Sequence, residues 1–303
     1  MRIALICSSL QPGRDGVGDY VRRLTNELRS MGHTSIAIAL NDPGDCLDEP
    51  NIIRLPRKTA WSKRWAQTRE CLAKFSPDLV SLQWVPYGWH PRGYPRGVAS
   101  PLSNIVPPNA KRHLMVHECW VGINIRDTIL HRVIIGPLQR AASLKVFRNW
   151  QAQVTHTSIP AFAACLQRYS IKATVLPLFG NIPVVNEGQI TTLDQLLPHD
   201  ANAAPQLIVA WFGTVPIEWN AGELLIRLSA AAKSHGRRLV ILSLGRTGAH
   251  GHKLTEWLNT KPDLGLHLPI GECSEAKLSS LLKSIDIGLS GVPLALVGKS
   301  GAI

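Results

Sequence analysis

Short apolar runs alternate with segments of helical periodicity along most of the chain. The run Ile3–Cys7 is apolar at every position, which is typical of a parallel strand covered on both faces. A helix is expected just after Gly18, because apolar residues recur there at helical spacing while charged residues take the other positions. These apolar positions are Val21, Leu24, Leu28 and Met31, and Gly32 ends the helix.

The same alternation continues through the first half of the chain. Further strands are expected at Thr34–Leu40, Asn51–Leu55, Asp78–Trp84, His113–Val116, Val154–Ser158 and Ala173–Leu178. Helices are expected at Ile129–Ser143, at Ala161–Tyr169 and before Pro77, where Trp61, Trp65, Thr68, Leu72 and Phe75 mark an inner face. Because the connections between strands are too long for hairpins, they predict a parallel, doubly wound sheet.

A polar, acidic segment then divides the chain. Residues 186–205 read as an interdomain linker with a short helix at Leu193–Leu197. The alternation begins again with strands at Gln206–Thr214, Arg238–Leu244 and Ile287–Ser290 and helices at Leu224–His235 and Leu278–Ile285. The predicted fold class is therefore α/β, with two Rossmann-like, doubly wound parallel-sheet domains at residues 1–185 and 206–303, the second incomplete.

The loop after the first strand carries Gly13, Gly16 and Gly18, and Asp19 is expected to cap the helix that follows. The glycine spacing does not fit the dinucleotide fingerprint G-x-G-x-x-G, so an NAD site is not predicted. A helix N-terminus behind such a loop presents N–H groups and a positive dipole end, which suit a phosphate, a carboxylate or a sugar hydroxyl. The alternative is a tight turn without a ligand.

Aromatic and basic side chains are concentrated in residues 85–96, just beyond a strand. Tyr87, Trp89, His90 and Arg92 stand there among prolines and glycines. Ligands bind at the carboxyl edge of open parallel sheets, where aromatic faces suit sugar rings and Arg suits phosphate or carboxylate. The segment is either a binding loop or a proline-stiffened loop whose rings pack on a neighbour.

Two further histidines are expected at that edge. His117 and Glu118 follow a strand directly, and such a pair suits acid–base chemistry, although a structural role is the alternative. A metalloprotease helix is excluded because a second His four residues after His117 is missing. His156, followed by Ser158, is either a substrate contact or a hydrogen-bonded, half-buried side chain.

The formal net charge is +12, and residues 1–183 hold 23 of the 33 basic residues but only 11 of the 21 acidic ones. A basic half suits an anionic lipid surface, a phosphorylated substrate or nucleic acid, or simply keeps a protein in solution. Nucleic acid is disfavoured because the basic residues are scattered singly and form no known binding module.

The six cysteines are far apart and none has C-x-x-C spacing. This pattern predicts reduced thiols in a cytoplasmic protein and neither a disulfide framework nor a zinc site. No segment is apolar enough for a signal peptide or a membrane span, so the expectation is a soluble protein, at most attached to the inner face of a membrane.

Several short motifs in order resemble the GT-B-type glycosyltransferases, in particular the large retaining group of family four. In the first half they are Gly16-Val17-Gly18-Asp19-Tyr20, Ser81-Leu82-Gln83-Trp84-Val85-Pro86-Tyr87 and His117-Glu118-Cys119-Trp120-Val121-Gly122. In the second half they are Phe212-Gly213-Thr214, Leu244-Gly245-Arg246 and Asp286-Ile287-Gly288-Leu289-Ser290, leading into Gly298-Lys299-Ser300-Gly301.

The resemblance implies transfer of a sugar from a nucleotide-diphosphate donor to a glycan or lipid-linked acceptor. In such enzymes two Rossmann-like domains face each other across a cleft, the first mainly holding the acceptor and the second the donor. By this resemblance, His117 contacts the sugar near the reacting carbon and forms a catalytic pair with Glu118. Tyr87, Trp89, His90 and Arg92 become acceptor-side candidates.

The donor candidates implied by the resemblance are Gly16, Gly18, Gly213, Arg246, Lys299 and Ser300. A departing nucleoside diphosphate gains negative charge, which a positioned cation stabilises, so Arg246 and Lys299 are expected to take that role without a metal or other cofactor. Arg246 taken alone is equally compatible with a solvated loop arginine. The segment around Lys299 lacks the upstream glycine of a Walker A motif.

The chain departs from family four in two respects. Residues 293–303 lack the two glutamates, separated by seven residues, that the family usually shows here, and the sequence stops where such proteins continue through another strand and a closing helix. The expectation is a fragment or a truncated product, with weak or no activity if the truncation is natural.

Two alternatives to transfer share this fold: a non-catalytic nucleotide-sugar binding protein and a UDP-sugar epimerase. Retaining and inverting enzymes also share it, so the stereochemistry of transfer stays open. The expected partners are a nucleotide sugar and a glycan or lipid-linked acceptor, with peripheral contact to an anionic membrane and no nucleic acid.

Overall fold

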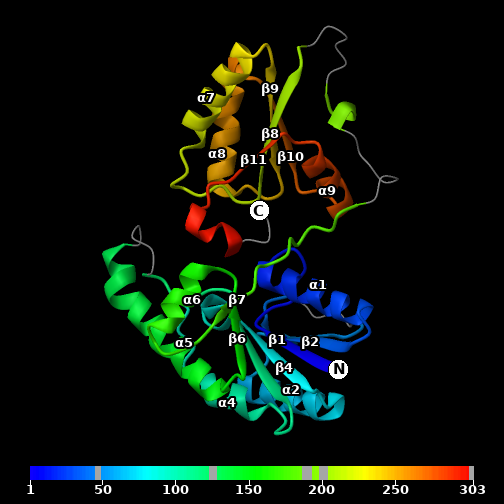
Figure 1. The fold of residues 1–303 in the computed structure, drawn as a ribbon, viewed down its shortest axis with the longest axis vertical. Helices are drawn as coiled ribbons and strands as arrows, with labels where there is room; N and C mark the ends of the chain where they lie inside the picture. The colour runs from blue at the N-terminus through cyan, green and yellow to red at the C-terminus, as the bar shows by residue number, and fades with distance from the viewer. Residues whose placement is uncertain (45–48, 123–127, 186–192, 198–203, 300–303) are drawn as a thin grey trace. The chain divides into compact units, whose positions relative to one another are not determined.

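The computed structural model describes residues 1–44, 49–122, 128–185, 193–197 and 204–299 (Figure 1). It contains two compact units. The first comprises Met1–Asn181 together with Gly298 and Lys299, and the second comprises Ile182–Val297.

The first unit is built on a parallel sheet of seven strands in the order β3-β2-β1-β4-β5-β6-β7. The strands are β1 (Arg2–Cys7), β2 (Thr34–Asp42), β3 (Ile52–Pro56), β4 (Leu79–Trp84), β5 (Lys111–Val116), β6 (Val154–Thr157) and β7 (Thr174–Val175). The predicted doubly wound sheet is confirmed, although its last strand is shorter than expected. The strand order reverses at β1, which pairs with both β2 and β4, and this reversal marks the edge position where open sheets bind ligands.

Helices surround this sheet. They are α1 (Gly16–Ser30), α2 (Trp61–Phe75), α3 (Pro86–Trp89), α4 (Ala99–Asn104), the π-helical turn η1 (His131–Ile135), α5 (Gly136–Trp150) and α6 (Pro160–Gln167). One core forms where Leu5 of β1 and Ala37 of β2 pack with Tyr20 and Val21 of α1. Burying a side chain the size of Leu stabilises the fold by about 1.5–3 kcal/mol, so this contact holds α1 firmly on the sheet.

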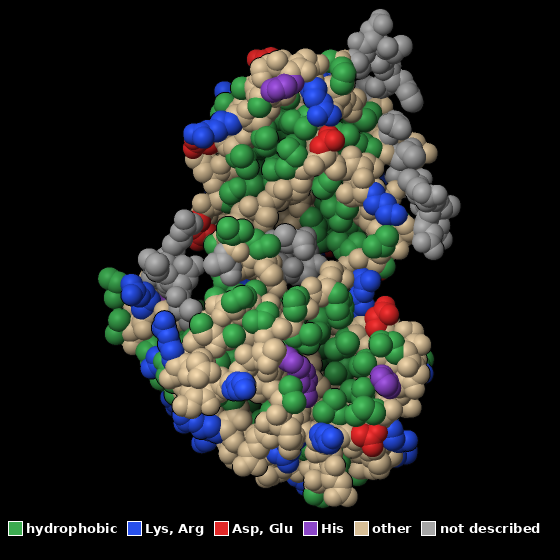
Figure 2. Space-filling model, viewed as in Figure 1, with side chains coloured by type: hydrophobic (Ala, Val, Ile, Leu, Met, Phe, Trp, Pro, Cys, Tyr) green, Lys and Arg blue, Asp and Glu red, His purple; other side chains and the backbone are tan. Residues whose placement is uncertain are grey.

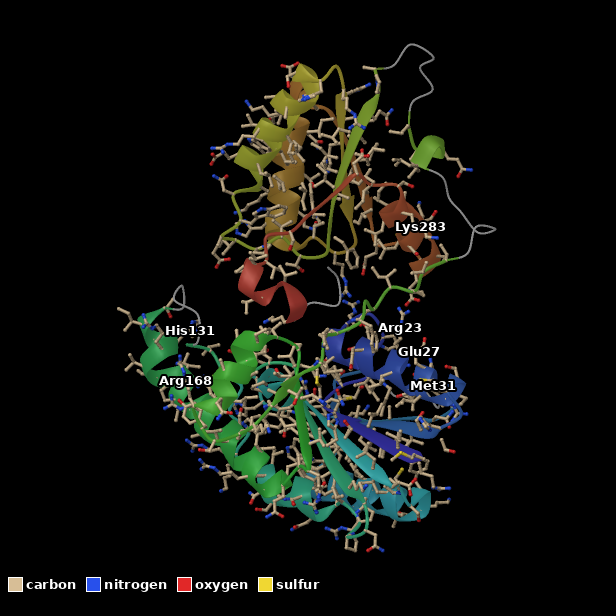
Figure 3. All side chains as sticks on the ribbon, in the orientation of Figure 1. Arg23, Glu27, Met31, His131, Arg168 and Lys283 are labelled. Carbon is tan, nitrogen blue, oxygen red and sulfur yellow. The ribbon has the colours of Figure 1, made fainter. Side chains whose placement is uncertain are left out.

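The outer face of α1 corrects one prediction. Met31, expected on the apolar face, is 72% exposed and lies just past the end of the helix. Figure 3 shows it beyond Arg23 and Glu27, which are spaced by four residues along the helix. The inner face is formed instead by Val21 with the half-buried Leu24 and Leu28.

Helix α2 also differs from its predicted pattern. Thr68 and Leu72 are buried as expected, but the third buried position is Arg64, while Trp61 and Trp65 are only half-buried. The Arg64 guanidinium reaches the Leu40 carbonyl at 2.6 Å and lies 3.7 Å from the centre of the Trp61 ring. Apolar spacing alone predicted the wrong inner face of α2, because the Arg64 side chain is buried and hydrogen-bonded.

The second unit has a parallel sheet of four strands in the described residues, in the order β10-β9-β8-β11. They are β8 (Gln206–Phe212), β9 (Arg238–Leu244), β10 (Leu266–Gly271) and β11 (Ile287–Leu289). Helices α7 (Ala221–Ser234) and α8 (Gly248–Asn259) cover one face, and α9 (Glu275–Lys283) covers the other (Figure 1).

The alternating direction of side chains along β9 explains why helices cover both faces of this sheet. Leu239 and Ile241 face the α7 and α8 side, whereas Val240 and Leu242 face α9. The described residues also form three 3₁₀ segments, η3 (Leu193–Gln195), η4 (Pro262–Leu264) and η5 (Leu294–Lys299). The predicted linker helix at Leu193–Leu197 is thus only the turn η3. Helix α8 and strand β10 were not predicted, because glycines interrupt the first and a proline the second.

Candidate functional site

Helix α1 begins at the carboxyl edge of β1, and its cap differs from the prediction. The Asp15 carboxylate accepts hydrogen bonds from the N–H groups of Val17, at 2.9 Å, and Gly18, at 3.0 Å. Asp19 lies within the first turn and instead accepts from the Gly13 N–H at 2.9 Å. The predicted cap and helix start are therefore wrong. Asp15 precedes the helix by one residue, which is the position from which a carboxylate reaches these amides.

The two candidate glycines of this turn have different surroundings. Gly18 is buried, and a Cβ there would lie 2.7 Å from the Ser9 carbonyl oxygen. Gly16 is exposed, and a Cβ there would meet nothing within 4 Å. Gly18 is therefore required for the close approach of α1 to the β1 loop, whereas Gly16 leaves open space at the helix start where a ligand could approach.

His117, directly after β5, begins a chain of buried polar groups. It is 5% exposed, and its Nε2–H donates to the Gln83 Oε1 at 2.8 Å. The Gln83 amide nitrogen donates to the Ser81 hydroxyl at 2.6 Å, so the amide oxygen faces His117 and fixes its tautomer. From Ser81 the chain continues to His113, at 2.6 Å, and from His113 to His156, at 2.9 Å.

Burial controls the charge of these histidines. Desolvation, with a smaller contribution from His113, lowers the pKa of His117 to about 3. Desolvation, with a smaller contribution from His156, likewise lowers the pKa of His113 to about 4. Both imidazoles are therefore neutral near pH 7. His156 is half-buried and hydrogen-bonded, as one of its two predicted alternatives requires.

Glu118 has a different partner from the one expected of an acid–base pair. Its carboxylate lies 2.6 Å from the Lys299 ammonium, and both residues belong to the first unit. The group that orients His117 is Gln83. His117 also meets the Tyr20 ring edge-on, with ring centres 5.0 Å apart, which places it beside the first turns of α1.

Three of the four aromatic-loop candidates line one pocket. This pocket, of about 530 Å³, lies where α2 and the loop after β3 meet the segment after β4, and Tyr87, Trp89 and His90 form part of its wall. Arg92 is exposed and lies outside the residues that line it, with its guanidinium 3.3 Å from the Tyr94 hydroxyl. Three of the four candidates are thus brought together at one pocket, and Arg92 lies apart from them.

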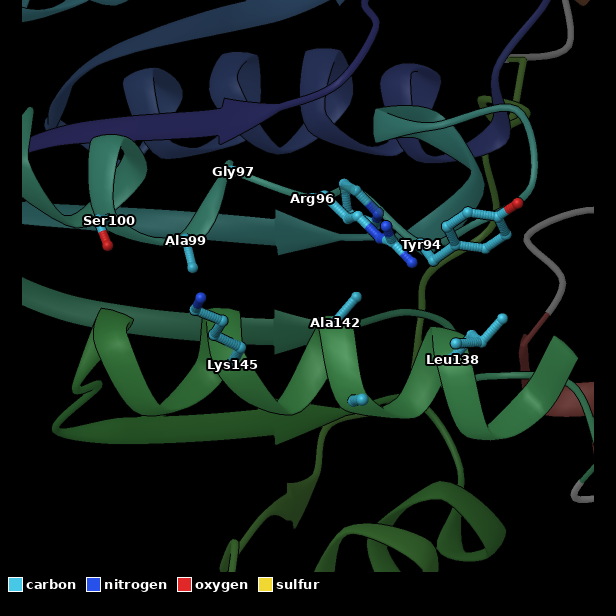
Figure 4. Close-up of a pocket in the computed structure, with 10 residues that line it drawn as sticks. Tyr94, Arg96, Gly97, Ala99, Ser100, Leu138, Ala142 and Lys145 are labelled. Carbon is cyan, nitrogen blue, oxygen red and sulfur yellow. The ribbon is translucent and has the colours of Figure 1, made fainter. Parts of the chain in front are cut away.

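A second pocket of the first unit, about 400 Å³, lies between residues 94–100 and helix α5 (Figure 4). Lys145 and Ala142 of α5 face the segment that carries Ala99 and Arg96. None of the predicted site residues lines it.

The second unit holds its own candidates at the carboxyl edge of β8 and β9. Gly213 follows β8 with φ of 82°, a left-handed conformation that favours glycine, and has open space at its Cβ position. Arg246 follows β9, is 45% exposed and pairs with Glu272 at 2.7 Å. The strand order reverses at β8, so both residues flank the ligand-binding edge of this sheet. Ser300 lies outside the described residues.

The remaining predictions concern cysteines, metals and membranes. The cysteines within the described ranges, at positions 7, 71, 119, 165 and 273, are free. In the same part of the chain, no three His, Cys, Asp or Glu side chains gather where they could hold a metal ion. A search of the helices in that part found none long and apolar enough to cross a membrane.

Sequence reasoning missed two residues of the site. Gln83 occupies a polar position in the otherwise apolar end of β4, next to Trp84, and that position was itself a signal. Arg64 is spaced by four residues from Thr68 and by eight from Leu72, so the period of α2 also pointed to it.

No family model matches the chain, and no curated protein matches its sequence. Among solved structures it is similar to Anabaena HepE in complex with UDP and glucose, at 13% identity and a TM-score of 0.60, over 97% of this chain and 76% of that one. It is similar to the lipopolysaccharide outer core galactosyltransferase WaaB at 12% identity and a TM-score of 0.52, over 98% and 77% of the two chains.

A third similar structure is an alpha-glucosyltransferase in complex with UDP-glucose and DNA containing an abasic site, at 13% identity and a TM-score of 0.52, over 93% of this chain and 69% of that one. The two parallel sheets and these likenesses define the GT-B fold of nucleotide-sugar glycosyltransferases. The predicted fold class is confirmed.

Proposed function

We propose that this protein is a glycosyltransferase that moves a sugar from a nucleotide-diphosphate donor to a glycan or lipid-linked acceptor. The observation that carries the proposal is the contact of His117 with Tyr20 of α1, because it joins the glycine-bearing start of α1 to the carboxyl end of β5. Gly16, one turn before Tyr20 in α1, has open space at its Cβ position, and the His117 imidazole is neutral. Such a group suits a hydrogen bond to a sugar hydroxyl better than proton transfer near pH 7.

In this proposal the second unit receives the donor. Gly213 leaves room for close approach of a ligand to the backbone, and Arg246 supplies a cation for the diphosphate. Lys299, which belongs to the first unit, and Ser300 are also proposed as donor-binding residues, and the Glu118 carboxylate pairs with the Lys299 ammonium. We propose that no metal or other cofactor takes part, because charged side chains stabilise the leaving diphosphate.

Two of the three structural neighbours support a nucleotide-sugar partner, since the HepE structure contains UDP and the alpha-glucosyltransferase structure contains UDP-glucose. Calorimetry with UDP and with UDP- and GDP-sugars, alongside assays of hydrolysis and transfer, tests the proposal. Binding followed by transfer to an acceptor supports it. Binding without turnover would identify a nucleotide-sugar binding protein, and an altered sugar in the absence of acceptor would identify an epimerase.

We also propose a peripheral position at the inner, cytoplasmic face of a membrane. Large apolar side chains around η1 are exposed: Ile129 by 79%, Leu130 by 55%, Val133 by 66%, Ile134 by 53% and Leu138 by 42%. Figure 2 shows hydrophobic side chains beside Lys and Arg at the left edge of the first unit, where Figure 3 places His131 of η1. An apolar helical face with basic neighbours suits an anionic lipid surface.

Flotation with vesicles tests this contact. Vesicles containing phosphatidylserine should carry the protein upward, and the change Val133→Asp with Ile134→Asp should abolish this, because charges replace the inserted face. The matched change Ile226→Asp, at an exposed apolar position of α7, should leave flotation unchanged. Equal flotation of both variants would contradict the proposal.

The nature of the acceptor is a separate part of the proposal. One structural neighbour is in complex with DNA, so this fold by itself does not exclude nucleic acid. We nevertheless propose no nucleic-acid partner, because the basic residues are dispersed along the sequence.

A further inference from the structure

The pocket lined by Tyr87, Trp89 and His90 also gathers positive charge. Arg57 and Lys58, from the loop after β3, and Arg64 of α2 line the same space. In the described part of the chain, no carboxylate lines it. An open cavity of about 530 Å³ with three cationic side chains is therefore suited to an anion.

Helix α2 presents its N-terminus to this pocket. Its first residue, Trp61, and the preceding Thr59 and Ala60 belong to the lining, and the N-cap residue Ala60 has no side chain that could accept from the first-turn N–H groups. In α1, by contrast, the Asp15 carboxylate takes that role. A helix of 15 residues without an N-terminal cap offers unsatisfied donors and a positive dipole end.

Two buried N–H donors on the lining residues are unpaired. Arg64 is 3% exposed and its Nε has no hydrogen-bond partner in the described structure; Trp89 is 4% exposed and its Nε1 likewise lacks one. The rest of Arg64 is held in place by the Leu40 carbonyl and by the Asn41 amide oxygen, at 2.9 Å. An unsatisfied buried donor is costly, and both donors belong to residues that line the pocket.

The positive charges of Arg57 and Arg64 repel each other. Burial, and secondly the neighbouring Arg57, lower the pKa of the Arg64 guanidinium. Arg64 has no ion-pair partner among the described residues, where it contacts the Leu40 carbonyl, the Asn41 amide oxygen and the Trp61 ring. A bound anion would offset both the repulsion and the desolvation.

Aromatic rings form the other wall of the pocket. Trp61 stacks near-parallel between Trp65 and Trp89, with ring centres 4.9 Å and 6.4 Å away, and Tyr87, 42% exposed, lies at the opening. Flat rings of this kind favour the apolar face of a sugar ring. The pocket therefore combines donors for an anion with a surface for a sugar.

We propose that this pocket binds the phosphate group of a phosphorylated sugar or glycan, which is the acceptor of the transfer reaction. Arg57, Lys58 and Arg64, with the N-terminus of α2, hold the phosphate, and the exposed ring of Tyr87 contacts the sugar ring. The acceptor role rests on the proposed glycosyltransferase function. The binding of a sugar phosphate does not depend on it.

Calorimetry on the full chain tests the binding step with three probes: glucose 6-phosphate, glucose and inorganic phosphate. Glucose 6-phosphate should bind at least about tenfold more tightly than glucose, because charge-assisted hydrogen bonds reach only the phosphate. It should also exceed inorganic phosphate, because the aromatic wall contacts only the sugar. No binding of glucose 6-phosphate, or affinity equal to that of glucose, overturns the proposal, and affinity equal to that of inorganic phosphate overturns the role of the aromatic wall.

Variants assign the binding to this pocket. The double change Arg57→Gln with Lys58→Gln should weaken the binding of glucose 6-phosphate about tenfold or more, whereas Arg69→Gln, at an exposed position of α2, should not. Equal loss in both variants would show dispersed charge attraction and overturn the site. Both variants replace exposed residues, so folding is expected to be retained.

A spectroscopic measurement gives an independent readout. The indole N–H resonance of Trp89, assigned with the variant Trp89→Phe, should shift on addition of glucose 6-phosphate because its unpaired donor lies in the pocket wall. An unmoved resonance under saturating ligand would contradict the site. UDP should bind equally to the wild-type chain and to the Arg57/Lys58 variant. Absence of UDP binding together with intact glucose 6-phosphate binding would refute the transferase function and leave the pocket assignment standing.

Discussion

The side chains of His117 and Gln83 are joined by a hydrogen bond of 2.8 Å between neighbouring strands of the first sheet. Both residues are buried, since His117 is 5% exposed and Gln83 is 2% exposed. The amide thus sets which imidazole nitrogen carries the proton, and it does so in a place that water scarcely reaches. The bond fixes the orientation of His117 before any ligand arrives.

The first prediction follows from this bond. Gln83→Met keeps the volume but leaves the buried His117 N–H without its acceptor, so the free energy of unfolding should fall by about 1–3 kcal/mol. Urea denaturation measures it. Gln167→Met, at an exposed position of α6, is the matched control and should change stability by less than about 0.5 kcal/mol. Equal stability of both variants would show that the polar chain contributes nothing.

The second prediction compares two glycines in the first turn of α1. Gly18→Ala places a Cβ 2.7 Å from the Ser9 carbonyl oxygen, so the helix must shift and stability should fall by about 1–3 kcal/mol. Gly16→Ala meets open space and should stay within about 0.5 kcal/mol of the wild type. Thermal unfolding followed by circular dichroism distinguishes them, and similar melting temperatures for the two variants would refute the close approach.

The third prediction concerns pH. Because burial lowers the pKa of His113 to about 4 and of His117 to about 3, the unfolded chain, with pKa values near the ordinary 6.5, binds protons first as the pH falls. The stability that these buried, neutral histidines contribute is therefore fully present above about pH 6.5, and it is lost as the pH falls below that value. Each histidine should contribute up to about 1.4 kcal/mol per pH unit between pH 6 and 5. Urea midpoints that do not change over that interval would disprove the buried neutral state.

A fourth prediction tests the proposed donor cation. Arg246→Gln should weaken UDP binding by about tenfold, because a charge-assisted hydrogen bond to the diphosphate is lost. Arg227→Gln offers a matched control, since Arg227 also pairs with a glutamate of the second unit, Glu223, at 2.6 Å. Calorimetry with UDP gives both affinities. A comparable effect of the two changes would remove Arg246 from the donor site.

The sequence predicted the structure best where the spacing of apolar residues determines an element. Strand β1 followed from a continuous apolar run, and β4 and β5 followed from shorter apolar stretches, which placed His117 at the correct sheet edge. Cap chemistry was harder: Asp15 and Asp19 are both acidic residues beside glycines, and only backbone geometry decides which carboxylate reaches the free amides.

The periodicity of apolar residues could not predict contacts between segments that are distant in the sequence. Nothing in the spacing of α2 shows that Arg64 finds the Leu40 carbonyl, which lies 24 positions earlier in the chain. The partner of His117 was likewise sought next to it in sequence, at Glu118, whereas the structure supplies Gln83 from the adjacent strand. Pairing across a sheet depends on strand order, which the pattern of the sequence limits but does not determine.

The interior position of β1 has a consequence for how the protein is made. During translation β1 leaves the ribosome before both of its neighbours, β2 and β4, and the register pairs Ile3 with Ser35 on one side and with Leu79 on the other. The apolar strand therefore stays unpaired while the chain grows, and a chaperone that binds exposed apolar segments should engage the nascent polypeptide until β4 has emerged.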